Sequence, residues 1–312
     1  SCSMYYMTRI KKRVDVLKLE NLTKQFGDKI AVDQLDMTVK PGEIMGLIGQ
    51  NGAGKTTTFR MILDFIKPDQ GQITWQGAPI TQEIKQKIGF LPEERGLYQK
   101  LTIEEQILYF AELHGMKRAE ARDELVRWMD KLEVVGKITD KVQTLSKGNA
   151  QKVQFIATLI HRPDFLILDE PFTGLDPVNT SLLMSEIKTL KANGAAIIFS
   201  SHNMSGVELL SDQLTMLKKG KVVLQGDIYG IRDSFGRTQI YVESDVPDAD
   251  LSAISGVETI EKQGAGRMIH VNDAAVGHEI FTRVSQSGYV QAFVQAPPTL
   301  DEIFRKEVAE NV

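Results

Sequence analysis

Cysteine is almost absent from this sequence, since Cys2 is the only one among 312 residues. A single cysteine excludes a disulfide framework and a cysteine-based zinc site, and this usage is typical of proteins in a reducing compartment. Long hydrophobic runs are missing as well. No stretch approaches the roughly 18 apolar residues of a transmembrane helix, so we expect that the chain does not span a membrane by itself.

The composition is otherwise that of an ordinary globular protein, with 25% charged and 42% hydrophobic residues. Its length is enough for two domains with sizeable cores. The charge is uneven: residues 225–312 contain 7 basic and 14 acidic residues, and the rest of the chain contains 30 and 27. Four basic residues between positions 9 and 13 are typical of a solvated tail, and contact with acidic lipid or nucleic acid is the alternative.

The most informative segment is residues 49–56, which have the spacing G-x-x-x-x-G-K-T of a phosphate-binding P-loop. Glycine has no Cβ, so several backbone N–H groups can approach one phosphate group. A helix that begins at the loop adds its positive N-terminal end. In this motif we expect Lys55 to reach the β- and γ-phosphates and the Thr56 hydroxyl to ligate Mg²⁺. The predicted nucleotide-binding residues of this region are Gly49, Asn51, Gly52, Ala53, Gly54, Lys55, Thr56 and Thr57.

The context of the loop supports this interpretation. Residues 43–48 form an apolar run after the turn signal at 40–42, which predicts a buried strand. Residues 57–66 carry apolar side chains at helical spacing and stop before Pro68. A strand, the loop and a helix are the context that the motif requires. A glycine-rich turn that precedes a lysine by chance is the alternative, and this context disfavours it.

Further strands are predicted on both sides of the loop. Residues 14–44 contain short or alternating apolar runs separated by turn signals, which indicate a small antiparallel sheet. Continuous apolar runs at 165–168 and 195–199 are typical of parallel strands that are buried on both faces. An amphipathic helix is predicted between them, at 181–191.

Residues 101–135 switch to helical periodicity, and a third helix is predicted further along the chain. The first predicted helix begins at a capping box formed by Thr102 and Glu105 and ends at Gly115. The second extends from about 119 to 136. The third follows Ser146 and continues to about His161, where a proline stops it.

The pattern changes near residue 220, and we expect a separate α/β unit after residue 227. It contains no chemical motif. Its predicted strands are 239–242, 268–271 and 290–294, and its predicted helices are 248–254, 274–287 and 300–308, while short strands at 214–217 and 221–224 precede it.

Two acidic residues, Asp169 and Glu170, end the strand predicted at 165–168. An acid in this position beside a P-loop suits Mg²⁺ binding through a water ligand of the ion, and a second carboxylate can polarise water for attack on the γ-phosphate. Strands ending in two acids are common, and the upstream P-loop favours the functional interpretation. Downstream of the P-loop, Ser146 and Gly148 begin a helix and offer another phosphate-binding helix end, a signal that is weak by itself.

The order of these segments resembles that of the ATP-binding-cassette (ABC) ATPases. The segments are the P-loop, a helical insert, Leu145-Ser146-Lys147-Gly148, the strand ending in Asp169-Glu170, Gly174-Leu175-Asp176, and Ser201-His202. The resemblance implies an α/β fold, a P-loop NTPase cassette over residues 14–224 with a mixed sheet core, an antiparallel β subdomain and a helical subdomain at about 97–163. A small C-terminal α+β domain at 225–312 and a disordered tail at 1–13 complete the expected organisation.

The resemblance also assigns roles to residues. Lys55, Thr56 and Thr57 belong to Walker A, and Asp169 and Glu170 belong to Walker B, with Glu170 as the catalytic base. His202 is similar to the switch histidine near the γ-phosphate, and Phe26 to the aromatic residue that stacks on adenine; a purely structural role is the alternative for both. Ser146, Gly148 and Asn149 belong to the signature motif, which meets the ATP of the opposite subunit, and Asp176 belongs to the D-loop.

Two departures from the family pattern stand out. The usual signature is Leu-Ser-Gly-Gly-Gln, whereas here Lys147 replaces the first glycine and Asn149 replaces the glutamine. In the Q-loop, Glu93 holds the position of a glutamine that ligates Mg²⁺. Glutamate also offers an oxygen to the metal, but it adds a negative charge beside the phosphates. These segments resemble a bacterial subgroup that includes sodium-extrusion and related export ATPases.

The resemblance implies the ATP-hydrolysing subunit of a bacterial ABC transporter, an exporter, that uses ATP and Mg²⁺. Two chains would form a homodimer around two ATP molecules and act on separate transmembrane permease subunits, at the cytoplasmic face of the cell membrane, without nucleic acid. A soluble ABC ATPase of translation or DNA repair is one alternative, and the single P-loop and absence of sustained heptads disfavour it. A non-hydrolytic regulatory module is another, motivated by Lys147 and Glu93. A GTPase is disfavoured because no Asn-Lys-x-Asp element is present.

Overall fold

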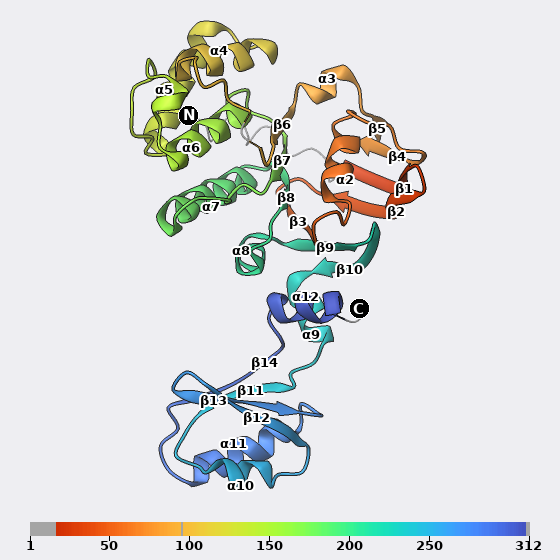
Figure 1. Cartoon of the computed structure of the whole chain (residues 1–312), viewed down its shortest axis with the longest axis vertical. Helices are drawn as coiled ribbons and strands as arrows, with labels where there is room; N and C mark the ends of the chain where they lie inside the picture. Colours follow the sequence, from red (N-terminus) through yellow and green to blue (C-terminus); the bar gives the residue numbers. More distant parts are fainter. Residues whose placement is uncertain (1–16, 95, 310–312) are drawn as a thin grey trace. The chain divides into compact units, whose positions relative to one another are not determined.

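The computed structural model of the chain describes residues 17–94 and 96–309. The disordered tail expected at 1–13 lies outside the described residues. The chain divides into two compact units, one up to Gln225 and the other from Gly226, and each is described by itself (Figure 1). Among the described helices, none combines the length and the hydrophobicity that a membrane crossing demands.

An antiparallel sheet forms the first part of unit 1, in the order β2-β1-β4-β5. The strands are β1 Leu17–Phe26, β2 Lys29–Val39, β4 Gln70–Trp75 and β5 Ala78–Pro79. The antiparallel sheet expected at 14–44 is confirmed, although its short runs join into two long strands whose register shifts at several points. The turn between β1 and β2 contains Gly27, whose φ of 56° suits a residue without Cβ.

A six-stranded sheet lies at the centre of unit 1, in the order β10-β9-β3-β8-β7-β6. The strands are β3 Ile44–Gly49, β6 Ile88–Leu91, β7 Phe165–Asp169, β8 Ala196–Ser200, β9 Gln213–Lys218 and β10 Lys221–Asp227. Strands β9, β3, β8, β7 and β6 are neighbours in this order, and each of the four pairs is parallel. Strands β3, β7 and β8 are buried at every residue, which explains their continuous apolar sequences.

The helices of unit 1 are α2 Lys55–Ile62, α3 Gln82–Lys85, α4 Ile103–Leu113, α5 Arg118–Lys131, α6 Lys147–Leu159, α7 Pro177–Ala192 and α8 Met204–Leu210, with a 3₁₀ turn at Val142–Thr144. Helices α4, α5 and α6 contact one another and form the helical subdomain, on the opposite side of the central sheet from the antiparallel sheet (Figure 1). The capping box predicted at the start of α4 is confirmed: Thr102 accepts from the Glu105 N–H, and the Glu105 carboxylate accepts from the Thr102 N–H.

Two helices, α2 and α5, end earlier than the sequence predicted, shortly before a residue in the left-handed conformation. Helix α2 was expected to reach residue 66, but it ends at Ile62, because Asp64 has a φ of 59°. The helix expected to continue to residue 136 ends at Lys131, shortly before Glu133 with a φ of 50°. No glycine marks either position, so the sequence does not signal the turn.

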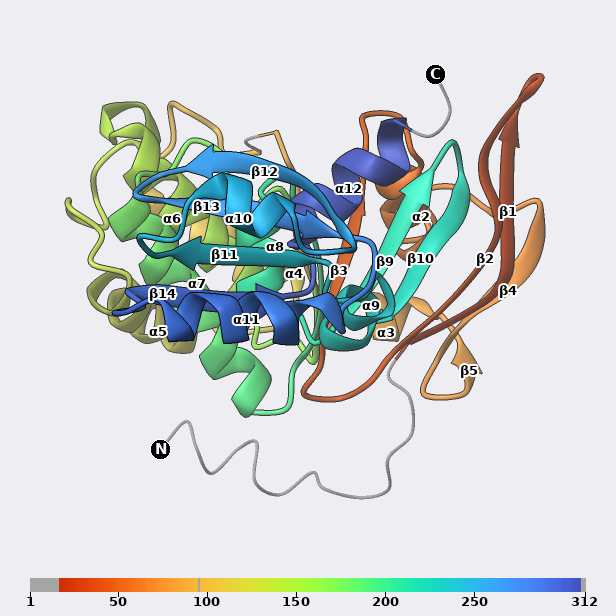
Figure 2. The same cartoon turned by 90° about the horizontal axis from the view of Figure 1, so that it is seen from below.

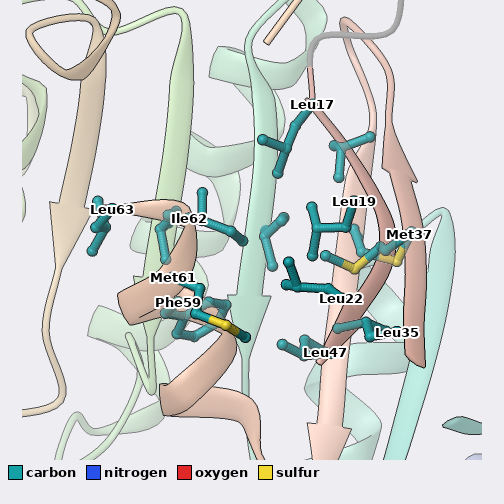
Figure 3. Packing of buried hydrophobic residues seen from close by; sticks show 14 of the residues in the cluster. Leu17, Leu19, Leu22, Leu35, Met37, Leu47, Phe59, Met61, Ile62 and Leu63 are labelled. Carbon is teal, nitrogen blue, oxygen red and sulfur yellow. The ribbon is translucent and has the colours of Figure 1, made fainter. Parts of the chain in front are cut away.

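A hydrophobic core fixes the position of α2. Phe59, Met61 and Ile62 of this helix belong to one cluster of buried side chains with Leu19 of β1 and Leu47 of β3 (Figure 3). Burial of each such side chain is worth about 1.5–3 kcal/mol. The first residue of α2 is the P-loop lysine, so this core also determines where the P-loop lies.

Unit 2 has a βαββαβ topology, the split arrangement in which two βαβ crossovers interleave. Its elements are α9 Ile228–Ser234, β11 Gln239–Glu243, α10 Asp248–Ser252, β12 Val257–Gln263, β13 Gly266–Val271, α11 Val276–Gln286, β14 Ala292–Ala296 and α12 Leu300–Ala309. The sheet is antiparallel, in the order β12-β13-β11-β14, and α10 and α11 cover the same face of it (Figures 1 and 2). The sequence did not predict β12, whose residues are mostly exposed and polar.

Candidate functional site

A pocket of about 440 Å³ opens around the N-terminus of α2. It gathers residues from both sheets, the P-loop and the loops that follow β6, β7 and β8. The lining residues are Phe26, Lys29, Ala31, Asn51, Gly52, Gly54, Lys55, Thr56, Thr57, Glu93, Asp169, Glu170 and His202. Only Lys29 and Ala31 were not singled out from the sequence. Both lie at the start of β2, directly after the turn that follows Phe26. Their closeness to Phe26 in the sequence could have predicted that they line the same pocket.

Two glycines give the P-loop its shape. Gly54 is the N-cap of α2 with a φ of 116°, and a Cβ on it would lie 2.5 Å from the Ala31 carbonyl oxygen. Gly49 has a φ of 152°, and a Cβ on it would lie 2.4 Å from the Leu217 carbonyl oxygen. No other residue type fits either position without a shift of the backbone.

The ammonium group of Lys55 lies inside the loop. Its Nζ donates hydrogen bonds to the carbonyl oxygens of Gly49, over 2.7 Å, and Gln50, over 3.2 Å. Lys55 is only 7% exposed, and this burial lowers its pKa, while the charges of Glu170 and Asp169 oppose the shift. The lysine is therefore a buried positive charge that faces two carboxylates across the pocket.

Asp169 and Glu170 stand at the carboxyl end of β7. The Ser200 hydroxyl of the neighbouring strand donates to Asp169 Oδ1 over 2.6 Å and accepts from the Glu170 backbone N–H over 3.0 Å. Both acids are almost fully buried, and burial raises the pKa of each. The hydrogen bond from Ser200 opposes the shift for Asp169, and the charge of Glu93 adds to it. Ser200 was missed because a serine that ends a strand carries no motif.

Glu170 and His202 are paired. His202 Nε2 lies 3.1 Å from Glu170 Oε1, and the His202 backbone N–H donates to Glu170 Oε2 over 3.4 Å. The charge of His202 opposes the burial that raises the Glu170 pKa. Glu170 has a φ of 50°, a conformation that is uncommon outside glycine and is often found at functional sites. The same Oε1 is buried and makes no hydrogen bond among the described residues, so the His202 ring nitrogen lies close to it without donating to it.

Helix α6 holds the loop that carries Glu93. The Gln154 side chain donates to the carbonyl oxygens of Pro92, over 3.4 Å, and Glu94, over 3.3 Å. Glu93 lies between these two anchored residues and lines the pocket. Within the described part of the chain, no three His, Cys, Asp or Glu side chains cluster as a ready metal site. A metal in this pocket would therefore take only a few ligands from the protein and the rest from phosphate and water, which is the usual pattern for Mg²⁺.

Several predicted residues do not line the pocket. Gly49 and Ala53 belong to the P-loop, but Gly49 presents its carbonyl to Lys55, and Ala53 is buried beneath the loop. The other residues, Ser146, Gly148, Asn149 and Asp176, form a second group, at the starts of α6 and α7.

Side-chain caps shape this second group. Ser146 caps α6 by accepting from the Asn149 N–H over 3.3 Å. Asp176 caps α7, and the backbone N–H of Asn179, together with its side-chain amide, holds the Asp176 pKa below its usual range. The group lies outside the pocket of its own chain, so a contact of these residues with ATP requires a second chain and stays a prediction.

Comparison with sequence families gives a match in each unit. Residues 32–173 match the family described as ABC transporter. Residues 226–308 match the family described as ATP-binding protein DrrA1-3-like, C-terminal domain.

Curated relatives cover nearly the whole chain. It is 42% identical to the ABC transporter ATP-binding protein YhaQ of Bacillus subtilis, over 94% of this chain and 98% of the relative. It is 32% identical to the linearmycin resistance ATP-binding protein LnrL of the same organism, over 87% and 85%. It is 29% identical to the Nod factor export ATP-binding protein I of Rhizobium etli, over 92% of each.

Solved structures match unit 1 in length. One, described as the ATP binding subunit of an ABC transporter, has a TM-score of 0.66 and 30% identity, over 71% of this chain and 93% of its own. Another is cbiO1 from Clostridium perfringens, described as part of the ABC transporter complex cbiONQ. It has a TM-score of 0.63 and 27% identity, over 70% of this chain and 90% of its own.

Proposed function

The chain belongs to the ATP-binding proteins of ABC transporters, and on this premise we propose that it hydrolyses Mg²⁺-bound ATP to drive a separate membrane permease. The observation that carries the proposal is the position of Glu170. This carboxylate lies in the same pocket as the P-loop lysine and Asp169, its Oε1 makes no hydrogen bond among the described residues, and burial raises its pKa. These are the properties of a general base beside a bound triphosphate.

The pocket provides a place for each part of ATP. The phosphates meet the N-terminus of α2, where the loop N–H groups and Lys55 supply positive charge. Phe26 is 51% exposed and lines the pocket, so its ring can stack on adenine. Lys24 Nζ lies 5.4 Å from the centre of this ring and orients it by a cation–π contact.

Mg²⁺ fits the oxygen donors of the pocket. Thr56, Glu93 and Asp169 line it together and would hold the ion, which prefers hydroxyl and carboxylate oxygens. When bound, the ion neutralises charge on the β- and γ-phosphates. Burial and the charge of Glu93 raise the Asp169 pKa, and a bound cation would oppose both effects.

Hydrolysis then follows from the residues around the γ-phosphate. Glu170 orients a water molecule and accepts its proton while the water oxygen bonds to the γ-phosphorus. The bond from that phosphorus to the bridging oxygen breaks, and ADP and phosphate leave. Lys55 stabilises the charge that develops on the phosphate oxygens, and His202 lies beside the Glu170 carboxylate.

A complete site requires two chains. Ser146 and Gly148 lie at the N-terminus of α6, outside the pocket of their own chain. In a head-to-tail dimer this helix end would meet the γ-phosphate held by Lys55 of the second chain. The second site would be identical by symmetry, since the same two surfaces face each other again.

The permease would dock on unit 1 along residues 90–100 and the helices between 101 and 135. Large apolar side chains are exposed there, among them Tyr98, Tyr109 and Leu113. Relatives named for linearmycin resistance and Nod factor export support an export direction. This assignment puts the chain at the cytoplasmic face of a bacterial cell membrane. It leaves no support for a role in translation or DNA repair.

Phosphate release from the purified full chain, with ATP and Mg²⁺, tests the proposal. The wild-type chain is expected to release phosphate, and both Lys55→Ala and removal of Mg²⁺ with a chelator are expected to abolish release. A wild-type rate equal to that of Lys55→Ala, also with the permease present, would instead support a regulatory module that does not hydrolyse ATP. Glu93 in place of glutamine is the feature that makes this alternative worth testing.

A further inference from the structure

The side chain of Lys147 lies against Gly174. This contact connects the start of α6 with the turn between β7 and α7 of the same chain. Lys147 is the first residue of α6, and Gly174 lies in the turn between β7 and α7. A Cβ built on Gly174 would lie 2.7 Å from Lys147 Cε and 2.8 Å from Nζ. The end of the lysine therefore fills the space that a larger residue at 174 would need. Gly174 also has a φ of 78°, which favours glycine.

The next residue of α6 extends this contact. A Cβ on Gly148 would lie 3.4 Å from Asn179 Nδ2 and 3.9 Å from Leu175 Cδ2, so the helix start packs closely on this segment. The Asn179 amide in turn donates to the Asp176 carboxylate. The start of α6 and the segment around the start of α7 thus form one packed group.

A third contact holds the other end of the same turn. The Gln151 side chain, one helical turn after Lys147, donates to the Pro171 carbonyl oxygen over 3.2 Å, and Gln151 is only 6% exposed. Helix α6 therefore holds the turn at its beginning, at Pro171, and at its end, at Gly174.

The turn begins at Glu170. The Thr173 backbone N–H donates to the Glu170 carbonyl oxygen over 3.2 Å, and the Thr173 hydroxyl donates to Glu170 Oε2 over 3.4 Å. A shift at Gly174 would therefore move Thr173 and, through it, the Glu170 carboxylate. Lys147 itself does not line the pocket.

We propose that Lys147 is a positioning residue for ATP hydrolysis, because its aliphatic stem, packed on Gly174, holds the turn at 170–175 and with it the Glu170 carboxylate. The inference rests on the proposed ATPase function. It gives a purpose to the lysine that replaces a signature glycine, since glycine has no side chain to make this contact. Both the last carbon of the stem, Cε, and Nζ approach the Cβ position of residue 174. We assign the role to the stem, and the variants below separate the stem from the charge.

Three variants of the full chain test this. Lys147→Gly removes the stem and is expected to lower kcat for phosphate release about tenfold, a modest displacement of a catalytic group, with KM for ATP unchanged. Lys147→Met keeps an unbranched apolar stem and is expected to retain kcat within about twofold. Lys147→Arg keeps the charge. If Lys147→Arg retained the wild-type rate while Lys147→Met were as slow as Lys147→Gly, the charge would matter and the proposal would be overturned.

Gly174→Ala provides an independent measurement. Its methyl group would displace the lysine, so the double variant with Lys147→Gly is expected to be no slower than Gly174→Ala alone. Additive losses would contradict the contact. The strain at residue 174 is present in both of these variants and cancels in the comparison.

The rate of the wild-type chain distinguishes a failure of the proposed ATP hydrolysis from a failure of the role of Lys147. Wild-type release no faster than that of Glu170→Gln would refute the proposed hydrolysis and this inference with it. Normal wild-type hydrolysis beside an unchanged kcat in Lys147→Gly would refute the role of Lys147 alone.

Discussion

Ser200 and Asp169 share a hydrogen bond of 2.6 Å between the ends of two neighbouring parallel strands. The same hydroxyl accepts from the Glu170 backbone N–H, so one serine holds the Asp169 carboxylate and the backbone of Glu170. Ser200 is fully buried, and its two partners are nearly so. The arrangement places two acids with raised pKa values at one end of the central sheet, beside the P-loop.

Ser200→Ala is expected to lower the free energy of unfolding by about 1–3 kcal/mol, because it leaves a buried acceptor and a buried N–H without their partner. It should also slow phosphate release, since Glu170 loses one of its anchors. Denaturant unfolding and release assays measure both effects. Ser181→Ala, at an exposed position of α7, is the matched control and is expected to change neither. Equal stability of the two variants would show that Ser200 does not hold the carboxylates.

Gly54→Ala is expected to prevent ATP binding. The added methyl group would overlap the Ala31 carbonyl oxygen, and the φ of 116° is strained for alanine, so the loop must shift away from its present shape. Binding of a fluorescent ATP analogue measures the effect. Gly77→Ala has a similar positive φ but meets no atom within 4 Å, and it is expected to leave binding intact. Normal binding by Gly54→Ala would contradict the assigned loop geometry.

Glu170→Gln is expected to raise the free energy of unfolding at neutral pH. Burial raises the pKa of Glu170, so the folded chain holds this proton more tightly than the unfolded chain, whose glutamates titrate near about pH 4.3. Above its raised pKa in the folded state, Glu170 is charged while buried, which lowers the free energy of unfolding. As the pH falls toward the pKa of the unfolded state, Glu170 becomes protonated in the folded state and this cost disappears.

The gain from Glu170→Gln should therefore shrink as the pH is lowered, as measured by denaturant unfolding at a series of pH values. Glu258→Gln removes an exposed carboxylate of β12 and serves as the control. A gain that grows on acidification would mean that the environment of Glu170 favours its charged form.

Deletion of residues 226–312 tests the role of unit 2. Because the chain divides into two compact units at Gln225, we expect the remaining cassette to fold and bind ATP. We also predict that unit 2 strengthens dimerisation, so the shortened chain should self-associate more weakly with ATP. Analytical ultracentrifugation compares the two forms. Unchanged self-association would assign unit 2 another role.

Strands β3, β7 and β8 of the central sheet and the P-loop could be predicted from the sequence because their physical demands leave a strong pattern. Buried parallel strands need continuous apolar runs, as in β7 and β8, and the phosphate loop needs glycines at fixed positions. Strand β12 could not be predicted, since its side chains are mostly exposed and its position depends on pairing with β13.

Site residues that belong to a sequence motif could be predicted. Site residues that only the fold brings to the pocket could not. Ser200 and Lys29 carry no motif, and only the register of β8 and the turn before β2 bring them to the site. The contact between Lys147 and Gly174 is of the same kind. The sequence shows Lys147 as an unusual residue, whereas only the fold shows that it lies against the turn that follows Glu170.

The central claim is that two chains close around ATP, and the molar mass of Glu170→Gln with and without ATP and Mg²⁺ tests it most directly. Light scattering after size exclusion should give a dimer with ATP and a monomer without it, because the variant binds ATP but cannot release the dimer by hydrolysis. Glu170→Gln combined with Ser146→Arg should stay monomeric, since the signature segment is blocked. A Glu170→Gln chain that binds ATP and yet remains a monomer at every ATP concentration would contradict the account.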